Sequence, residues 1–387
     1  MKPLPDYVLQ CLSVFFEAGV EAFLVGGCVR DLLLGRTPQD YDIASAAPPE
    51  RVMELFDHVV PTGLRHGTVT VLLKEGAVEI TQFRMDGEYK DHRRPDTVRP
   101  ASTIVEDLSR RDFTINAMAL GPKGLVDPFG GLADCRARII RAVGDPSRRF
   151  SEDALRILRA YRFACQLAFT IEADTKAAAF PLFPLLAHIS RERIYAELSK
   201  ALSGSCPSRL TPFLKAGPLA FAGLPPLTRP YPDGLPAFLP VRIAALCFLC
   251  GCSAQSFCAA MRCDKATARE SRAAEDFLLS PLPASSAGWR RALSAFTKEE
   301  LERWLAAREI LTGESSAMAL QRLRKTADAQ PPVHMRDLAI TGEDLLALGY
   351  TGPAVGKILR GLLEAVWESP GLNQKSRLLE LARQWGR

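Results

Sequence analysis

The chain has 387 residues, of which 47% are hydrophobic and 24% charged, and its formal net charge at pH 7 is +5. This composition is that of an ordinary globular protein with about two to four domains, which excludes a mainly disordered, fibrous or low-complexity chain. The excess of basic residues is concentrated in residues 136–162, which contain eight arginines and only three acidic residues. We therefore expect a polyanionic partner at this segment.

The first third of the chain has a mixed pattern. Residues 8–16 are apolar and are followed by Glu17 and Glu21 without a small-residue cleavage site, which favours an amphipathic helix over a signal peptide. Residues 22–25, 69–73 and 78–83 have the character of strands, and residues 74–77 join the last two as a hairpin. After Arg136 helical periodicity takes over and continues to the C-terminus.

The helical part contains a proline-rich segment and a long uncharged segment. Nine prolines lie between Pro207 and Pro240 and cannot occupy helix interiors, so they predict a linker or short helices joined by turns. Residues 243–261 are uncharged but include polar side chains, which favours a buried helix over a membrane span. We expect a cytoplasmic protein with no membrane contact.

Cysteines gather in this same apolar region. They are Cys247, Cys250, Cys252, Cys258 and Cys263. The first two have a C-x-x-C spacing, but no second pair at matching spacing follows, so buried small hydrophobic residues are favoured over a metal site.

The strongest local signal is FLVGGCVRD at residues 23–31, followed by DYDI at residues 40–43. A strand that ends in two glycines and opens into a helix lets backbone N–H groups approach a phosphate, and Arg30 adds a bidentate donor. If Asp40 and Asp42 lie on one strand, they project from the same face and can both ligate a divalent metal. Two metals about 4 Å apart would activate a hydroxyl and stabilise a leaving pyrophosphate.

The string GGCVRDLLLGRTPQDYDIAS resembles the first motif of the class II tRNA nucleotidyltransferases, which comprise CCA-adding enzymes and their bacterial poly(A) polymerase relatives. Four further segments agree in order and spacing, namely PTGLRHGTVTV (61–71), FRMDGEYKDHRRPDTV (83–98), RRDFTINAMA (110–119) and SEDALRILRAYRF (151–163). With the C-terminal segment, the resemblance spans nearly the whole chain and is specific.

The resemblance implies an α+β protein. A polymerase-beta-like nucleotidyltransferase head with a small mixed sheet is expected at residues 1–140. An all-α neck (141–206) with a nucleotide-base-reading helix, a helical body (207–330) and a helical tRNA-binding tail (331–387) follow. The tail contains five cations that could contact the tRNA backbone near the elbow or could be solvated helix charges, namely Lys357, Arg360, Lys375, Arg377 and Arg383.

The resemblance also implies roles for single residues. Gly27 and Arg30 bind the triphosphate, and Arg111 is a further phosphate contact. Asp40 and Asp42 are the catalytic carboxylates and ligate Mg²⁺.

Three neighbouring polar residues have open roles. Asp112 and Asn116 order either the sugar or the local backbone. Glu79, expected to face inward on its strand, is either a third metal carboxylate or an ordinary strand residue.

The fifth motif bears on the substrate. We expect Ser151 to cap a helix with Asp153 in its first turn, from which Arg156, Arg159 and Arg162 follow at intervals of three. In a helix, side chains three residues apart are rotated by about 60° from one another around the axis, so these four side chains cannot all face one point. Arg159 and Arg162 are expected to approach phosphates or to hold the helix in place, with a solvated basic face as the alternative.

The resemblance assigns base reading to Asp153 and Arg156. A carboxylate accepts from the exocyclic amine of cytosine or adenine, while a guanidinium donates to the adjacent ring nitrogen. Uracil and guanine present the opposite order, and each bidentate contact is worth about 1–3 kcal/mol of discrimination. The protein would therefore act as its own template.

These features predict Mg²⁺-dependent addition of CCA to the 3′ acceptor end of tRNA from CTP and ATP, with release of pyrophosphate. The polar loop at residues 86–96 resembles one present in relatives that add the terminal A, which argues against a CC-only enzyme. The segment PTGLRHGTV differs from the glycine-basic-phenylalanine signature of the poly(A) polymerases. An A-adding enzyme with a CC-adding partner, a poly(A) polymerase and a non-catalytic tRNA-binding protein are the alternatives. The oligomeric state stays open, with a homodimer among the options.

Overall fold

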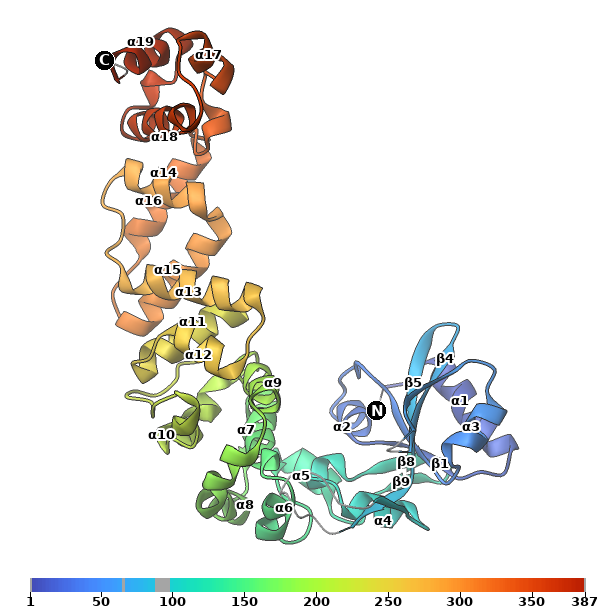
Figure 1. Ribbon diagram of the computed structural model, residues 1–387. Helices are drawn as coiled ribbons and strands as arrows, with labels where there is room; N and C mark the ends of the chain where they lie inside the picture. Colours follow the sequence, from blue (N-terminus) through green and yellow to red (C-terminus); the bar gives the residue numbers. More distant parts are fainter. Residues whose placement is uncertain (1, 65–66, 88–97, 386–387) are drawn as a thin grey trace. The chain divides into compact units, whose positions relative to one another are not determined.

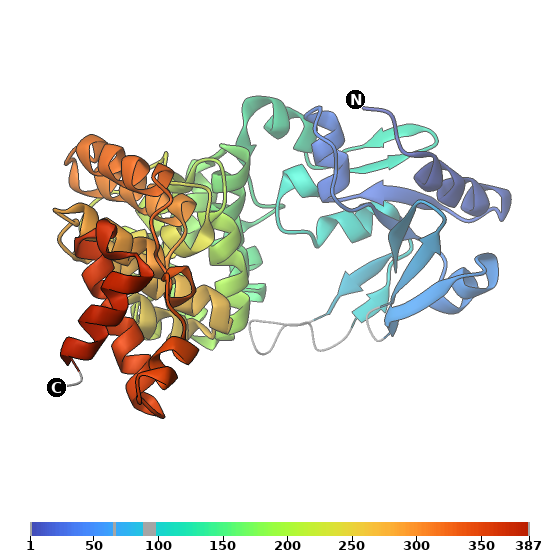
Figure 2. The same ribbon diagram turned by 90° about the horizontal axis from the view of Figure 1, so that it is seen from above.

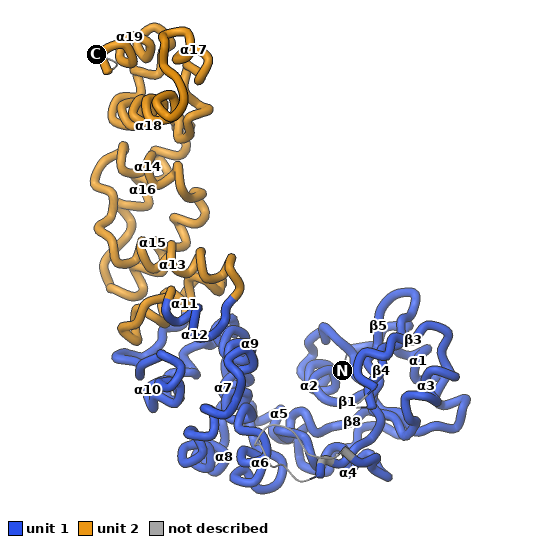
Figure 3. The backbone as a smooth tube through the Cα atoms, viewed as in Figure 1, with its two compact units in different colours: residues 1–233, 256–263 blue, residues 234–255, 264–387 orange. Residues whose placement is uncertain are grey.

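The computed structural model describes residues 2–64, 67–87 and 98–385. The backbone forms two compact units, which Figure 3 colours separately. Unit 1 contains residues 1–233 and 256–263, and unit 2 contains residues 234–255 and 264–387. The chain therefore passes between the units at three places. The finer boundaries expected at residues 140, 206 and 330 stay predictions.

Unit 1 contains a seven-stranded sheet in the order β3-β4-β5-β2-β1-β8-β9 (Figure 1). Its strands are β1 (Ala22–Val25), β2 (Asp42–Ser45), β3 (Val59–Gly63), β4 (Thr68–Leu73), β5 (Gly76–Gln82), β8 (Ala119–Gly121) and β9 (Gly124–Val126). The β2–β5 pair is parallel and the other pairs are antiparallel. This confirms the small mixed sheet expected for the head.

Four short strands lie outside this sheet. They form an antiparallel pair, β6 (Arg84–Asp86) with β7 (Val98–Pro100), and a parallel pair, β10 (Ile139–Ile140) with β11 (Thr170–Ile171).

The three predicted strands are all present. The apolar run at residues 22–25 is β1, and the runs at residues 69–73 and 78–83 are the antiparallel strands β4 and β5. The turn between β4 and β5 is shorter than expected, because Leu73 pairs with Gly76 and leaves only Lys74 and Glu75 to reverse the chain.

One face of the sheet is apolar. Leu24 pairs with Ile43, which in turn pairs with Ile80. Since cross-strand partners share a face, these three buried side chains lie together. Helices α1 (Asp6–Glu17) and α3 (Pro49–Leu55) lie on one side of the sheet (Figures 1 and 2). Helix α1 is amphipathic as expected, with Val8 among its buried residues.

The opposite face carries acidic side chains. Asp42 pairs with Glu79, so the two project from the same face, which they share with Ala44. Ala44 packs with Leu108 of α4 (Ile104–Ser109) in a small core cluster. Glu79 is exposed, so the expectation that it faces inward was wrong. The buried side chains of β5 are those of Val78 and Ile80. Because successive side chains of a strand point to opposite faces, Glu79 between them points away from this core.

Within residues 2–233, unit 1 also contains the helices α2 (Gly27–Leu33), α5 (Gly131–Ala137), α6 (Pro146–Glu152), α7 (Leu155–Leu167), α8 (Ala173–Ala179), α9 (Arg191–Leu202) and α10 (Thr211–Lys215). A short 3₁₀ turn, η2 (Thr114–Asn116), lies in the RRDFTINA segment. Helix α7 packs along α9, and nearly all its residues are buried.

The start of α7 differs from the expectation. Asp145 caps α6 through a backbone N–H two residues later, and Pro146 occupies the first position of that helix. Ser151 lies inside α6, so the expectation that it caps the next helix was wrong. Asp153 is extended (φ −139°, ψ 104°), and its Oδ1 accepts from the backbone N–H of Leu155 at 3.0 Å. Asp153 therefore lies between α6 and α7 rather than in the first turn of α7.

The region rich in proline begins as short helices joined by turns. It contains η4 (Pro207–Leu210), α10 and η5 (Ala220–Ala222), after which the chain is irregular until α11 (Leu239–Cys250). The single buried helix expected at residues 243–261 is instead two helices, α11 and α12 (Ala254–Met261). Gly251 ends α11 in the left-handed conformation (φ +70°), which redirects the chain.

Membrane and cysteine expectations bear on the same helices. In the described ranges, no single helix has the length and apolarity of a membrane span, and α11 with α12 meet that test only as a bent pair. Cys247, Cys250 and Cys258 are buried, whereas Cys252 and Cys263 are partly exposed.

Unit 2 is helical. Besides α11 it contains α13 (Lys265–Leu279), α14 (Ser286–Ala295), α15 (Lys298–Thr312), α16 (Ala317–Asp328), α17 (Gly342–Ala347), α18 (Pro353–Glu368) and α19 (Lys375–Trp385). Residues 348–352 separate α17 from α18, with Gly349 and Gly352 at positive φ. Leu345, Leu362, Val366 and Leu378 from α17, α18 and α19 share one buried cluster. The expected succession of an α+β head and helical segments is confirmed.

Candidate nucleotide site

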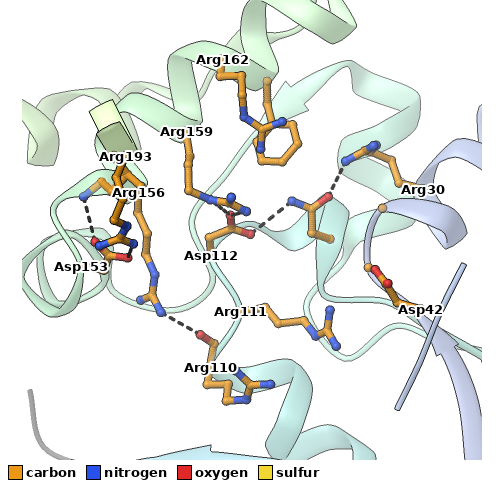
Figure 4. A pocket seen from close by; sticks show the side chains of 15 residues that line it. Arg30, Asp42, Arg110, Arg111, Asp112, Asp153, Arg156, Arg159, Arg162 and Arg193 are labelled. Carbon is orange, nitrogen blue, oxygen red and sulfur yellow. Dashed lines mark hydrogen bonds and ion pairs between the residues drawn. The ribbon is translucent and has the colours of Figure 1, made fainter. Parts of the chain in front are cut away.

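A pocket of about 490 Å³ in unit 1 collects most of the predicted site residues (Figure 4). It is lined by Gly26, Gly27, Arg30, Asp42, Arg110, Arg111, Asp112, Asn116, Asp153, Leu155, Arg156, Arg159, Arg162, Phe163 and Arg193. These residues come from the β1–α2 turn, α2, the start of β2, the RRDFTINA segment, Asp153 between α6 and α7, α7 itself, and α9.

The β1–α2 turn requires glycine. Gly26 has φ +75° and ψ −134°, a conformation that residues with a side chain rarely adopt. A Cβ at Gly26 would lie 3.0 Å from Nη1 of Arg111. The turn therefore lets the Arg111 guanidinium come against the backbone just before Gly27 opens α2.

Arg30 is buried and held from two sides. Its Nη1 donates to Oδ1 of Asn116 at 2.7 Å, and its Nε donates to Oδ1 of Asp31 at 2.9 Å. Its guanidinium carbon also lies 5.3 Å from the ring centre of Phe163 on α7. The orientation of Arg30 is thus fixed.

A polar chain connects α7 to Arg30 (Figure 4). Arg159 donates to Oδ2 of Asp112 through Nε at 2.8 Å and Nη2 at 2.6 Å, and Asn116 donates to Oδ1 of Asp112 at 3.2 Å. Burial alone would raise the pKa of Asp112, but the Arg159 charge and the hydrogen bonds from Arg159 and Asn116 lower it to about 2. Asp112 therefore stays ionised and acts here on side chains, not only on its local backbone.

Asp42 lies at the wall of the pocket with two other carboxylates near it. Burial raises its pKa to about 6, assisted by the charges of Glu79 and Asp40 and opposed by Arg111. Asp40 is exposed, precedes β2 and does not line the pocket. The expectation that both aspartates lie on the strand was wrong, because β2 begins only at Asp42.

The expected base-reading pair lies at the other end of the pocket. Asp153 accepts from Nη2 of Arg193 at 2.8 Å through its Oδ2. Nη1 of Arg156 donates to Oε2 of Glu152 at 2.7 Å, and its Nη2 donates to the carbonyl oxygen of Arg110 at 3.2 Å. Neighbouring groups thus hold both members of the pair in place.

Arg162 is the last member of the arginine series on α7. It forms an ion pair with Glu197 of α9 at 2.5 Å, and its guanidinium carbon lies 3.8 Å from the ring centre of Phe163. Glu197 is also 3.6 Å from Arg159. The series therefore does not form a solvated basic face, because Glu197 and Asp112 neutralise it on the pocket side.

Sequence reasoning found eight of these lining residues as candidate site residues. They are Gly27, Arg30, Asp42, Arg111, Asp153, Arg156, Arg159 and Arg162. It missed Arg110 and Arg193. Arg110 stands inside a quoted motif, whereas Arg193 lies 40 residues from Asp153 and no local pattern connects them. Most of the loop expected at residues 86–96 lies outside the described residues.

The carboxylates beside the pocket are the candidate ligands of a metal ion. Within residues 2–64, 67–87 and 98–385, no three His, Cys, Asp or Glu side chains already converge as a closed ligand set. Asp42 and Glu79 nevertheless share a face. The pKa of Asp42 is raised first by burial and then by the negative charges of Glu79 and Asp40, which a divalent cation would neutralise. The residues fit an oxygen-ligated cation, and a divalent metal is a general requirement of nucleotidyltransferases.

Comparisons with known proteins match three parts of this chain to family models. Family models match at residues 22–141 (Poly A polymerase head domain), 168–212 (RNA and SrmB-binding site of polymerase A) and 241–382 (tRNA nucleotidyltransferase domain 2). The head match and the mixed sheet define the protein as a nucleotidyltransferase.

Relatives of similar length specify the family. A CCA-adding enzyme of Geobacillus stearothermophilus is 37% identical over 388 residues, covering 95% of this chain and 93% of that protein. One from Leuconostoc citreum is 39% identical and covers 99% of this chain and 98% of that protein. The chain belongs to the CCA-adding enzyme family. The crystal structure of the Bacillus stearothermophilus CCA-adding enzyme in complex with CTP superposes with a TM-score of 0.84 at 33% identity, covering 100% of this chain and 98% of that one.

Proposed function

We propose that this protein adds C, C and A to the 3′ end of tRNA, using CTP and ATP and releasing pyrophosphate, with its own side chains as the template. One observation carries the proposal. Asp153 and Arg156, which can pair with a base, line the same pocket as Arg30 and Asp42, which suit the triphosphate and a metal. A single nucleotide could therefore contact both ends of this pocket.

The base end supplies selectivity. The Asp153 carboxylate accepts from an exocyclic amine, and the Arg156 guanidinium donates to the neighbouring ring nitrogen. Cytosine and adenine both present this order, whereas uracil and guanine reverse it, so the wrong bases would leave polar groups unpaired. One pair can therefore select both CTP and ATP.

The phosphate end supplies charge. Gly27, Arg30 and Arg111 bind the triphosphate at the β1–α2 turn. Arg159 holds α7 against the RRDFTINA segment through Asp112, and Arg162 holds α7 against α9 through Glu197. Asp40 and Asp42 would hold Mg²⁺, with Glu79 as a further candidate ligand. When bound, this ion would polarise the phosphate and favour the ionised 3′ hydroxyl of the tRNA. Positioning and charge stabilisation then carry the transfer.

The same proposal includes where tRNA binds. Its acceptor end enters the pocket of unit 1, and the cations of α18 and α19 contact its backbone nearer the elbow. The cytoplasmic location expected from the sequence belongs to this proposal as well.

The test is incorporation from CTP alone, ATP alone and both together, resolved to single nucleotides. The transcripts end either before CCA or after CC. We expect two C residues and then one A on the shorter transcript. A addition confined to the CC-ending transcript would mean an A-adding enzyme, and long A tails would mean a poly(A) polymerase.

The control variant is Asp42→Asn, which keeps the size of the side chain but removes its charge. We expect it to abolish incorporation and to leave tRNA binding intact. Binding of tRNA without incorporation by the unsubstituted protein would contradict the proposal and favour a non-catalytic tRNA-binding protein.

A further inference from the structure

Asp107 contacts two pocket arginines from outside the pocket. It lies on α4 and is 1% exposed. Its Oδ2 accepts from Nε of Arg111 at 3.3 Å and from Nη2 at 3.0 Å. Its Oδ1 accepts from Nε of Arg110 at 3.1 Å and from Nη2 at 2.7 Å. One buried carboxylate thus serves two guanidinium groups.

The carboxylate cannot readily turn away from Arg111. Oδ1 is held by Arg110 and also accepts, at 3.3 Å, from the backbone N–H of Arg84. Rotation would leave the buried Asp107 charge without its partners, which is costly at a position that water does not reach. Burial raises the pKa of Asp107, but the charges of Arg111 and Arg110 and their hydrogen bonds hold it below its ordinary value. Asp107 is therefore a fixed anchor.

This anchor determines which edge of Arg111 faces the pocket. The edge formed by Nε and Nη2 is used by Asp107. Nη1 lies against the β1–α2 turn, 3.0 Å from the position of a Cβ on Gly26. A guanidinium is planar and its donors are fixed relative to one another, so holding one edge aims the other. Arg111 is therefore oriented before any nucleotide arrives.

We propose that Asp107 is a positioning residue for nucleotidyl transfer, which aims Nη1 of Arg111 at the nucleotide bound beside the β1–α2 turn. This inference rests on the proposed function. Asp107 does not line the pocket, so it acts on the nucleotide only through the two arginines that it holds, and of these Arg111 is the one that lies against the β1–α2 turn. It contacts neither Asp153 nor the guanidinium of Arg156 in the described structure, so it should not affect the choice between bases.

The experiment compares Asp107→Asn with the unsubstituted protein in single-nucleotide incorporation. The amide has the shape of the carboxylate but no charge, and one of its two polar atoms is a donor that repels a guanidinium. We expect the KM for CTP and for ATP to rise by a similar factor of about 10, with a smaller change in kcat. The preference for CTP and ATP over UTP and GTP should stay unchanged.

A double-substitution cycle separates positioning from a merely structural role. In an Arg111→Ala background, Asp107→Asn should raise KM no further, because the group it aims is gone. An unchanged KM in the single variant would overturn the proposal, as would an equal rise with and without Arg111. If the unsubstituted protein fails to incorporate nucleotides, the proposed function fails and not this inference.

Glu106→Gln is the matched control. Glu106 neighbours Asp107 on α4, but its Oε2 accepts from the backbone N–H groups of Ser102 at 2.7 Å and Thr103 at 3.2 Å rather than from a pocket arginine. Weakening this cap should lower stability and leave KM unchanged.

If Asp107→Asn does not fold, Arg111→Lys tests the same contact. A single ammonium cannot bind Asp107 with one edge and face the turn with another. We expect KM to rise by about 10-fold there too. A Lys variant with the original KM would overturn the proposal.

Discussion

Among the described residues, seven arginines and three aspartates line the nucleotide pocket, and most of the arginines are already paired within the protein. Asp112, Asp107 and Glu197 each hold two cationic or amide groups in place. A nucleotide therefore meets guanidinium groups whose orientations are already set, which lowers the entropy lost on binding. The surplus positive charge remains available to the triphosphate.

The pairing of Asp112 with Arg159 predicts an acid transition. The pKa of Asp112 is lowered from 3.8 to about 2 on folding. A lowered pKa stabilises the fold above pH 4, and that contribution of about 2 kcal/mol is lost as the pH falls from about 4 to about 2. We expect Asp112→Asn to be less stable at pH 7 and to lose less stability in this window. Urea unfolding at a series of pH values measures both.

The matching variant is Arg159→Gln, which removes the cation from the same pair. It should flatten the pH dependence of unfolding in the same window, because Asp112 then titrates nearer its ordinary range. Parallel curves for Asp112→Asn and the unsubstituted protein would contradict this account.

Arg193 predicts an effect on base selection. It is tethered to Oδ2 of Asp153, while Oδ1 accepts from the Leu155 N–H, so the carboxylate plane is fixed. We expect Arg193→Met to leave Asp153 free to turn. CTP and ATP should be used less well by similar factors, and discrimination against UTP should fall by about 10-fold. Competition assays with pairs of nucleotides measure this ratio.

Arg191→Met is the control, because Arg191 is on the same helix but donates to the carbonyl of Phe221 and stacks on its ring. It should keep the original selectivity. If both variants change discrimination equally, a general loosening of α9 would explain the result instead.

At the scale of the element, sequence patterns predicted a helix or strand well where residues close together in the sequence determine it. The apolar run 22–25 and the β4–β5 hairpin formed as expected, because alternation and a turn are sufficient to define them. The start of α7 was placed wrongly, because two capping signals compete and Asp145 with Pro146 begins an earlier helix. The single helix at residues 243–261 was wrong because Gly251 at positive φ outweighs the continuous apolar pattern.

Site prediction followed the same limits. Asp107 stands three and four residues before Arg110 and Arg111, a spacing that would place them together on a helix, so a signal was available. Arg193 and Glu197 approach α7 only through the packing of α9, which no sequence spacing reveals. The motifs identified groups that can touch a nucleotide, while most groups that orient them were found only in the folded chain.

The β1–α2 turn predicts a strong requirement for glycine. In Gly26→Ala the backbone would keep a strained conformation, and the new Cβ would lie 3.0 Å from Nη1 of Arg111. We expect a loss of about 1–3 kcal/mol in unfolding free energy and a higher KM for both nucleotides, since Arg111 must move. Urea unfolding and incorporation kinetics measure the two effects.

Gly130→Ala separates strain from displacement. Gly130 also has positive φ (+75°), but a Cβ there meets nothing within 4 Å. It should lose stability by about 1–2 kcal/mol without a change in KM. A rise in KM for this variant as well would show that backbone strain alone disturbs the pocket.

At the scale of the whole molecule, the order of the chain does not match the order of the units. The sequence predicted a head followed by helical segments, and unit 1 indeed contains the sheet. Residues 256–263, however, return to unit 1 after α11 has joined unit 2. Within unit 1, Arg262 from this returning segment forms an ion pair with Glu192 on α9. No change of composition in the sequence marks this return. The expected domains were therefore continuous segments of the chain.

This return predicts how fragments behave. A fragment of residues 1–233 lacks the segment 256–263, so the part of unit 1 that it covers would be exposed to water. A fragment of residues 1–263 restores that segment but carries α11, of whose twelve residues ten are buried in the full chain, without the α13 against which it packs. We expect the shorter fragment to unfold at lower urea than the nucleotide-binding unit of the full protein, and the longer one to self-associate through α11. Urea titration followed by the binding of CTP, together with sedimentation, measures both. A fragment 1–233 with the urea midpoint and CTP affinity of the full chain would show instead that residues 1–233 form an independent folding unit.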